Sequence, residues 1–163
     1  GYKAVNSKCP WTLSIDSDFI YNVPELKRLF EVAKEGNVDG VIGSRYIKQS
    51  RLVDYPILKK ISNRIYHNLL RATFHIKQKD LTNNFKLYKT NIFKTIKWQS
   101  TDFSINAETG LLPIIKGYKI VEVPVSWIQR NWGKSNFKVF KLAIGYLKVF
   151  HRTKKLAKFR NKD

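Results

Sequence analysis

The chain has 163 residues, 43% of them hydrophobic and 26% charged, and its formal net charge at pH 7 is +19. The length and hydrophobic fraction are those of one globular domain with a sizeable core, while the large positive charge indicates an anionic partner, such as nucleic acid, an acidic membrane surface or a phosphorylated substrate. The single cysteine, Cys9, excludes an internal disulfide, and no apolar run approaches the roughly 18 residues of a membrane span.

A short apolar segment near the start of the chain is followed by two acids. Residues 11–15 have the length and composition of a buried strand, and Asp16 and Asp18 come directly after it. Carboxylates two residues apart point to the same side of an extended segment, and ligands of open α/β sheets bind beyond the carboxyl ends of the strands. Two such acids form the oxygen-only site that Mg²⁺ or Mn²⁺ prefers. The alternative is that they only cap the following helix.

The next segment predicts a helix and a second strand. The helix begins at Asn22 and Pro24, and its apolar stripe consists of Leu26, Leu29, Phe30 and Ala33. Residues 39–43 form the strand, and Arg45 stands at its end. A strand, a helix and a strand at this spacing form a βαβ unit, which predicts a parallel sheet.

A long helix and two further strands follow. The helix runs from Pro56 to about Phe74, and its apolar face consists of Ile57, Ile61, Ile65, Leu69 and Leu70. A loop that begins at Asp80 leads into one strand, and residues 119–125 form the other. Pro124 indicates that this last strand lies at an edge of the sheet or ends there.

The C-terminal segment, from Phe137 to Arg160, combines aromatic and aliphatic residues at helical spacing with many lysines and arginines. Such a basic amphipathic helix is typical of a membrane interface. The alternative is a helix that packs on the core and continues into a solvated basic tail.

Four motifs, taken in order, resemble the family 2 inverting glycosyltransferases, and within them the dolichyl-phosphate mannose synthase-like branch. The motifs are Asp16-Ser-Asp18, Val41-Ile-Gly-Ser-Arg45-Tyr46, Asp80-Leu-Thr-x-x-Phe85-x-Leu-Tyr88, and Glu122-Val-Pro124-Val followed by Arg130-x-x-Gly133-x-Ser135. Each motif is weak alone, and their order makes the resemblance specific over approximately residues 1–150.

The resemblance implies a GT-A fold, which is an α/β fold with a mostly parallel, Rossmann-like sheet flanked by helices. It implies transfer of a sugar from a nucleotide-sugar donor to a polyprenyl (dolichyl-type) phosphate. Residues 1–136 would be the C-terminal part of the catalytic domain, without its first strands, and residues 137–163 a basic helix and tail at the membrane interface. We therefore expect a fragment of a longer protein, an expectation that fits the lack of methionine. The protein would lie on the cytoplasmic face of a membrane, as a peripheral protein with an anionic lipid surface as partner.

Residue roles follow from the same resemblance. Asp16 and Asp18, as the DXD motif, would hold Mg²⁺ or Mn²⁺ on the donor diphosphate, while Arg130 and Ser135 would lie near the donor phosphates. Asp16, Asp18 and Arg130 are thus the expected catalytic residues. The residues expected at the acceptor phosphate are Arg45, Lys59, Ser62 and Asp80.

The chain departs from the family pattern at several of these positions. Ile20 stands where a Gln, as a further metal ligand, often follows the acids, so the metal site is weaker or differently completed. Lys59 and Lys60 precede Ser62 in place of an Arg. A lysine keeps the charge that attracts a phosphate, but it lacks the bidentate geometry of arginine.

A phosphate acceptor is already ionised and needs no general base, which fits a sequence with many cations and few candidate bases. The acids to consider as bases are Asp80 and Glu108, although Glu108 is equally well interpreted as an exposed helix residue. The three histidines, among them His67, lack ligand spacing and receive little functional weight.

Two other functions remain open. One is non-catalytic binding to an anionic membrane or to nucleic acid, although the basic residues are spread along the chain and no recognised nucleic-acid-binding motif occurs, which argues against nucleic acid. The other is a catalytically incomplete glycosyltransferase fragment.

Overall fold

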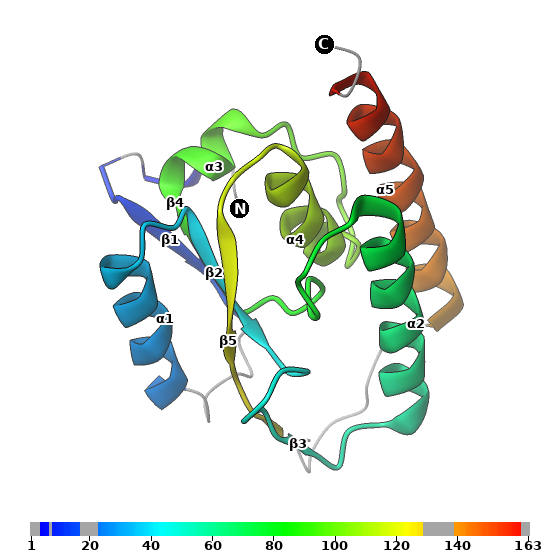
Figure 1. Ribbon diagram of the computed structural model, residues 1–163, viewed down its shortest axis with the longest axis horizontal. Helices are drawn as coiled ribbons and strands as arrows, with labels where there is room; N and C mark the ends of the chain where they lie inside the picture. The colour runs from blue at the N-terminus through cyan, green and yellow to red at the C-terminus, as the bar shows by residue number, and fades with distance from the viewer. Residues whose placement is uncertain (1–3, 7, 17–22, 129–138, 161–163) are drawn as a thin grey trace.

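Strands and helices alternate along the chain and assemble into an α/β fold (Figure 1). The computed structural model describes residues 4–6, 8–16, 23–128 and 139–160. The strands are β1 (Trp11–Ser14), β2 (Gly40–Ser44), β3 (Leu52–Val53), β4 (Lys86–Lys89), β5 (Ile120–Pro124) and β6 (Trp127–Ile128). The helices are α1 (Val23–Glu35), α2 (Ile57–Phe74), α3 (Thr90–Thr95), α4 (Ile105–Ile115) and α5 (Val139–Arg160).

The main sheet has four strands in the order β1-β4-β2-β5, and β3 and β6 form a small separate sheet. The α/β class is therefore confirmed, but the sheet is mixed. β2 and β5 are parallel neighbours, whereas β4 is antiparallel to both β1 and β2. β1 and β2 consequently run in the same direction but are not neighbours, because β4 lies between the two strands of the predicted βαβ unit.

The direction of β4 follows from the loop before it. α2 leads to a loop at residues 79–84, and the chain enters β4 from the carboxyl ends of β1 and β2. In the register, Lys86 at the start of β4 lies opposite Ser14 and Ile42, near the ends of their strands. This loop therefore crosses the edge of the sheet where ligands of α/β proteins bind.

The outer strands of the sheet are β1 and β5. The edge position that Pro124 predicted for its strand is thus confirmed. The strand predicted at residues 11–15 forms over Trp11–Ser14, but its residues are only half-buried and Ile15 is 40% exposed, so the predicted burial is wrong. An outer strand has a neighbour on one side only, which explains this exposure.

Each face of the sheet has its own core. On one face Leu29 and Ala33 of α1 pack against Val41, Leu87 and Val123. The other face is covered by α2, α3, α4 and α5, whose buried members include Leu70, Ile92, Leu111 and Val149. The predicted stripe of α1 is narrower than expected, because Phe30 is 37% exposed.

Of the five residues predicted to form the apolar face of α2, only Leu70 points into the core. Ile57, Ile61, Ile65 and Leu69 are 75%, 51%, 65% and 39% exposed, and Leu58 is 63% exposed. The buried residues of α2 are Tyr66, His67 and Leu70. Apolar residues thus lie on both sides of this helix, and helical periodicity alone does not tell which side packs.

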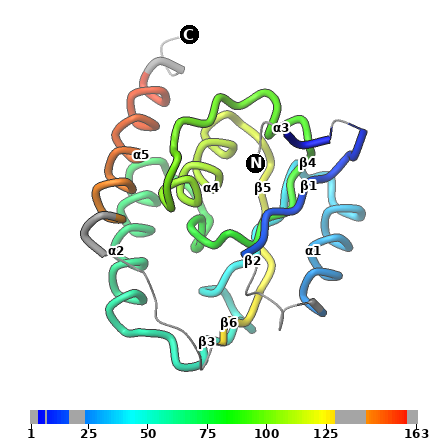
Figure 2. The backbone as a smooth tube through the Cα atoms, turned by 180° about the vertical axis from the view of Figure 1, so that it is seen from behind, coloured from blue at the N-terminus to red at the C-terminus, as the bar shows by residue number. Residues whose placement is uncertain are grey.

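α5 lies beside α2, as both views of the backbone show (Figures 1 and 2). The two helices run in the same direction, because the rings of Tyr66 and Tyr146 are 4.9 Å apart and those of Phe74 and Phe150 are 5.7 Å apart. α5 therefore packs on the core through one face, while Ile144, Leu147 and Leu156 remain 57%, 45% and 48% exposed. Within the described residues, no helix has both the length and the apolar composition needed to cross a bilayer.

Candidate functional site

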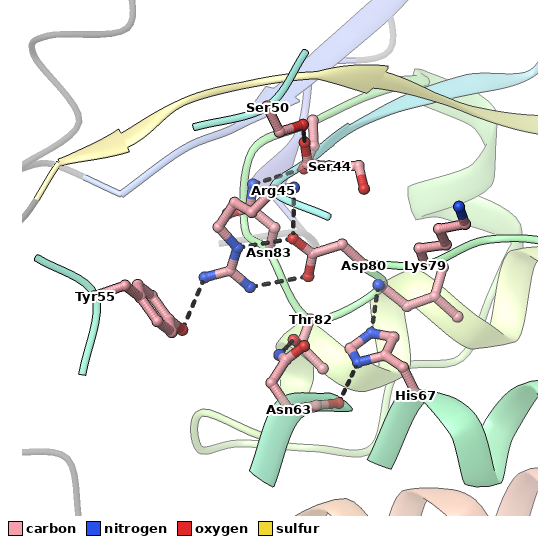
Figure 3. Close-up of polar contacts among 12 residues, drawn as sticks. Ser44, Arg45, Ser50, Tyr55, Asn63, His67, Lys79, Asp80, Thr82 and Asn83 are labelled. Atoms are coloured by element: carbon pink, nitrogen blue, oxygen red, sulfur yellow. Dashed lines mark hydrogen bonds and ion pairs between the residues drawn. The ribbon is translucent and has the colours of Figure 1, made fainter. Parts of the chain in front are cut away.

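The centre of the candidate site is an ion pair between Arg45, directly after β2, and Asp80, in the loop before β4 (Figure 3). The Arg45 Nε lies 2.7 Å from Asp80 Oδ2, and Nη2 lies 2.9 Å from Oδ1. The backbone N–H of Arg45 also donates to Oδ2, at 2.9 Å. Two parallel N–H···O bonds give the pair its bidentate geometry. Of the residues predicted at the acceptor phosphate, these two are brought together.

Burial makes this pair strong. The Asp80 side chain is fully buried and that of Arg45 is 10% exposed. Burial raises the pKa of Asp80, but the adjacent Arg45 guanidinium outweighs this effect and holds the pKa below its ordinary value. Burial lowers the pKa of Arg45, and the Asp80 carboxylate more than offsets it. Asp80 is therefore an ionised counter-ion of Arg45, and a carboxylate with a lowered pKa is a poor general base.

Aromatic rings surround the free side of the Arg45 guanidinium. Its Cζ lies 5.7 Å from the ring centroids of both Tyr46 and Tyr55. Nη1 has a long contact of 3.4 Å to the Tyr55 hydroxyl, and Arg64 of α2 lies 4.8 Å above the ring of Tyr46. Two cations thus share an aromatic environment beside the end of β2.

Glu122 of β5 holds the backbone of the loop that carries Asp80. Its Oε2 accepts the N–H of Lys79 at 2.9 Å, and its Oε1 accepts the N–H of Asp80 at 2.8 Å. Burial raises the pKa of Glu122, although these hydrogen bonds oppose the shift. The sequence motif contained Glu122, but its task as the support of the Asp80 backbone was not predicted.

His67 of α2 holds the next N–H of the same loop. The Leu81 N–H donates to Nε2 at 2.7 Å, so Nδ1 carries the ring proton and donates to the Asn63 carbonyl oxygen at 2.8 Å. Burial lowers the pKa of His67 to about 4, which keeps the ring neutral. Sequence reasoning gave this histidine little weight. Its position between the buried Tyr66 and Leu70 is the signal that identifies it, once the packed face of α2 is known.

The far end of the loop reaches the predicted donor side. Asn84 donates from Nδ2 to Asp16 Oδ1 at 2.8 Å, and its Oδ1 accepts the Ser14 hydroxyl at 2.6 Å. Asp16 itself is exposed at the carboxyl end of β1. The other predicted donor-side residues, Asp18, Arg130 and Ser135, lie outside the described residues.

The family model for Glycosyl transferase family 2 matches residues 1–97, which include Asp16, Arg45 and Asp80. The chain belongs to this family. The α/β fold with its mixed sheet is the GT-A type that the sequence motifs implied.

Three relatives are similar over most of this chain. A polyprenol monophosphomannose synthase of Mycolicibacterium smegmatis is 26% identical over 130 residues, which cover 76% of this chain and 47% of the relative. An undecaprenyl-phosphate mannosyltransferase of Micrococcus luteus is 24% identical over 126 residues, which cover 76% of this chain and 51% of the relative. A dolichyl-phosphate hexose transferase of Haloferax volcanii is 27% identical over 125 residues, which cover 74% of this chain and 51% of the relative. The chain therefore spans about half the length of the curated relatives that it matches.

Lys59 and Ser62 lie on α2 and are half-buried. The contacts from α2 to the loop come from neighbouring residues: Asn63 donates to the Thr82 hydroxyl at 2.8 Å, and Arg64 to the Lys79 carbonyl oxygen at 3.0 Å. The roles of Lys59 and Ser62 at an acceptor phosphate stay predictions.

A buried lysine lies beneath the site. Lys86 is fully buried, and its Nζ donates to the Asn106 carbonyl oxygen at 2.6 Å and to the Thr109 hydroxyl at 2.8 Å. Burial lowers its pKa to about 7.

Glu108, a candidate base in the sequence, is also buried and accepts hydrogen bonds from the N–H of Ser100 at 2.7 Å and from Arg152 at 2.6 Å. Its interpretation as an exposed residue is wrong, and these contacts give it a structural role between α4 and α5.

The acidic end of β1 fits a hard divalent cation. The fit depends on the exposed carboxylate of Asp16, whose oxygens are the ligand type that Mg²⁺ and Mn²⁺ bind, with water and phosphate completing the shell. In the described part of the chain no three His, Cys, Asp or Glu residues gather as a metal cluster.

Proposed function

We propose that the protein containing this chain is a metal-dependent inverting glycosyltransferase that moves a sugar from a nucleotide-sugar donor to a polyprenyl phosphate. The observation that carries the proposal is the loop at residues 79–84. At one end it holds Arg45 through Asp80, and at the other it touches Asp16 through Asn84. The residues expected at the acceptor and at the donor are thus linked by one short segment. The substrates named for all three relatives support the same reaction class.

On this proposal, Arg45 binds the acceptor phosphate. Asp80 fixes the guanidinium through Nε and Nη2, and among the described residues Nη1 makes a long contact of 3.4 Å to the Tyr55 hydroxyl. Nη1 could therefore donate to a phosphate oxygen that comes within reach, while Nε and Nη2 keep the bidentate pair. The acceptor arrives as an anion that can attack directly, so Asp80 need not take a proton.

The donor diphosphate would be held at the opposite end of the loop. Asp16 and Asp18 would bind Mg²⁺ or Mn²⁺, and such a cation stabilises the charge that develops on the diphosphate when the bond to the sugar breaks. Arg130 and Ser135 would contact the donor phosphates. Ionised oxygens of the acceptor and the diphosphate thus face separate cationic groups.

We further propose that the protein lies on the cytoplasmic face of a membrane, with an anionic lipid surface as its partner. Two observations support this. The outer face of α2 carries the exposed residues Ile57, Leu58, Ile61, Ile65 and Leu69. The neighbouring α5 carries exposed apolar residues together with exposed lysines at 148, 154, 155 and 158. Apolar side chains flanked by cations suit the boundary between acyl chains and anionic head groups.

The reaction is tested with the whole protein, labelled nucleotide-sugars and a short-chain polyprenyl phosphate. Replacing Asp18 with Ala removes a metal ligand, and we expect it to abolish most of the turnover, as does chelation of divalent ions. Glu31→Gln, on the exposed side of α1, is the matched control and should leave the rate unchanged. Near-normal turnover of the Asp18 variant would refute the metal role. No transfer by the whole protein with any donor would favour the incomplete-enzyme alternative.

A further inference from the structure

We propose that Asn84 is a positioning residue for the divalent cation at Asp16, an inference that rests on the proposed metal-dependent reaction. Asn84 stands at an unspecified position of the motif Asp80-Leu-Thr-x-x-Phe85, so the resemblance assigned it no role. Its place in the site follows from two side-chain contacts, one to Asp16 and one to Ser14 of β1.

Asn84 fixes one oxygen of the Asp16 carboxylate. The amide Nδ2 donates to Oδ1 at 2.8 Å. At the other end of the amide, Oδ1 accepts the Ser14 hydroxyl at 2.6 Å. The two bonds use both ends of the amide, so its orientation is set by β1 itself. With Oδ1 of Asp16 engaged, Oδ2 would be the oxygen available to a cation, and a hydrogen bond to the other oxygen would orient the carboxylate as a ligand.

The backbone that carries Asn84 is held firmly enough to do this. Residues 79–81 donate their N–H groups to Glu122 and His67, and the Asn83 amide donates to the Gly43 carbonyl oxygen at 2.6 Å. Gly110 of α4 lies directly against Leu81, where a Cβ would collide with the Leu81 carbonyl oxygen. A short loop held at residues 79–81 and 83 places the side chain that follows within a small range of positions, which is what support of a ligand requires.

This support has a reason in the sequence. Ile20 stands where a Gln often supplies a further metal ligand in this family, so fewer protein groups would hold the cation here. A site with fewer ligands depends more on the orientation of those that remain, and Asn84 orients Asp16. Loss of such a supporting partner typically lowers metal affinity by about 10- to 100-fold.

The test measures Mn²⁺ affinity directly, by electron paramagnetic resonance of the free ion, in the whole protein with and without nucleoside diphosphate. We expect Asn84→Ala to weaken Mn²⁺ binding by at least about tenfold. The matched control is Asn83→Ala, which removes a hydrogen bond from the same loop without touching Asp16. Because Asn83 also helps to hold the loop, this variant should weaken Mn²⁺ binding, but by less than Asn84→Ala does. The melting temperature of each variant, measured without metal, reports any loss of folding.

The outcomes separate the two proposals. If the wild type and Asp16→Asn bind Mn²⁺ equally, or neither binds it, the metal role itself is wrong. If Asp16→Asn loses binding while Asn84→Ala keeps wild-type affinity, only the role of Asn84 is overturned. An equal loss of affinity in the Asn83 and Asn84 variants also overturns it, because the effect would then come from a displaced loop.

Discussion

The Arg45–Asp80 pair predicts a large loss of stability when its carboxylate is neutralised. In Asp80→Asn the side chain keeps its shape, but the guanidinium of Arg45 loses its counter-charge in a place where only 10% of that side chain is exposed. Breaking a buried ion pair by removing one partner typically costs about 3–5 kcal/mol, because the other charge is left uncompensated. We expect a loss of this size in the free energy of unfolding at pH 7.

The same pair predicts how this loss depends on pH. Arg45 holds the pKa of Asp80 below its ordinary value in the folded protein, while the unfolded chain has a pKa of about 3.9. Between these values the unfolded state binds more protons than the folded state, so stability falls as the pH falls. The contribution of the pair is complete above about pH 4 and disappears as the pH drops through the folded pKa. The difference between wild type and Asp80→Asn should shrink in that acidic window.

Urea denaturation followed by circular dichroism measures both effects. Glu31→Gln is the matched control, since its partner Lys27 lies 3.8 Å away and the two side chains are 52% and 83% exposed. Exposed pairs of this kind contribute about 0.5 kcal/mol or less. The double variant Arg45→Met/Asp80→Leu should be more stable than Asp80→Asn, because it buries no unpaired charge. If Asp80→Asn lowers the free energy of unfolding no more than Glu31→Gln does, the Arg45–Asp80 pair does not organise the site.

Two further predictions concern Lys86 and the outer face of α2. Burial lowers the pKa of Lys86 to about 7, below that of an unfolded lysine, so the free energy of unfolding should rise between about pH 7 and pH 10. Lys86→Met should flatten this rise in denaturation experiments. Ile61→Asn/Ile65→Asn should weaken binding to anionic liposomes in a sedimentation assay, whereas Phe30→Asn on α1, across the sheet, should not. Liposome binding that ignores salt, anionic lipid content and the α2 change would contradict the membrane proposal.

The sequence motifs located the parts of the site that have fixed spacing along the chain. Arg45 at the end of one strand and Asp80 at the start of a loop were predicted at the same phosphate, and the structure joins them. The supporting residues were not predictable in this way. His67 and Glu122 act through contacts to backbone N–H groups of a loop that is distant in the sequence. Such contacts need the packing of α2 and β5, which no local pattern contains.

Two features of the fold were missed for related reasons. β4 had the composition of a strand, but composition does not reveal direction, and its antiparallel insertion depends on where the loop turns. α2 has apolar residues on opposite sides, with Leu70 buried and Ile65 exposed. Helical periodicity reveals an apolar stripe, but it does not tell whether that stripe packs on the protein core or faces the surroundings of the protein. The exposed apolar residues of α2 are therefore the observation from which a binding surface on this helix is proposed.

The site and the net charge of +19 serve different tasks in this protein. Arg45 is paired with Asp80, so the two charges nearly cancel at a distance and act only on a group in direct contact. The excess charge lies elsewhere, in part on the exposed lysines of α5. An unpaired surface charge acts over a Debye length of about 8 Å at physiological salt. On the proposed function, attraction to an anionic surface would therefore come from exposed cations such as those of α5, whereas recognition of one phosphate would come from the geometry around Arg45. A salt titration should weaken the first and leave the second largely unchanged, because buried pairs are screened little.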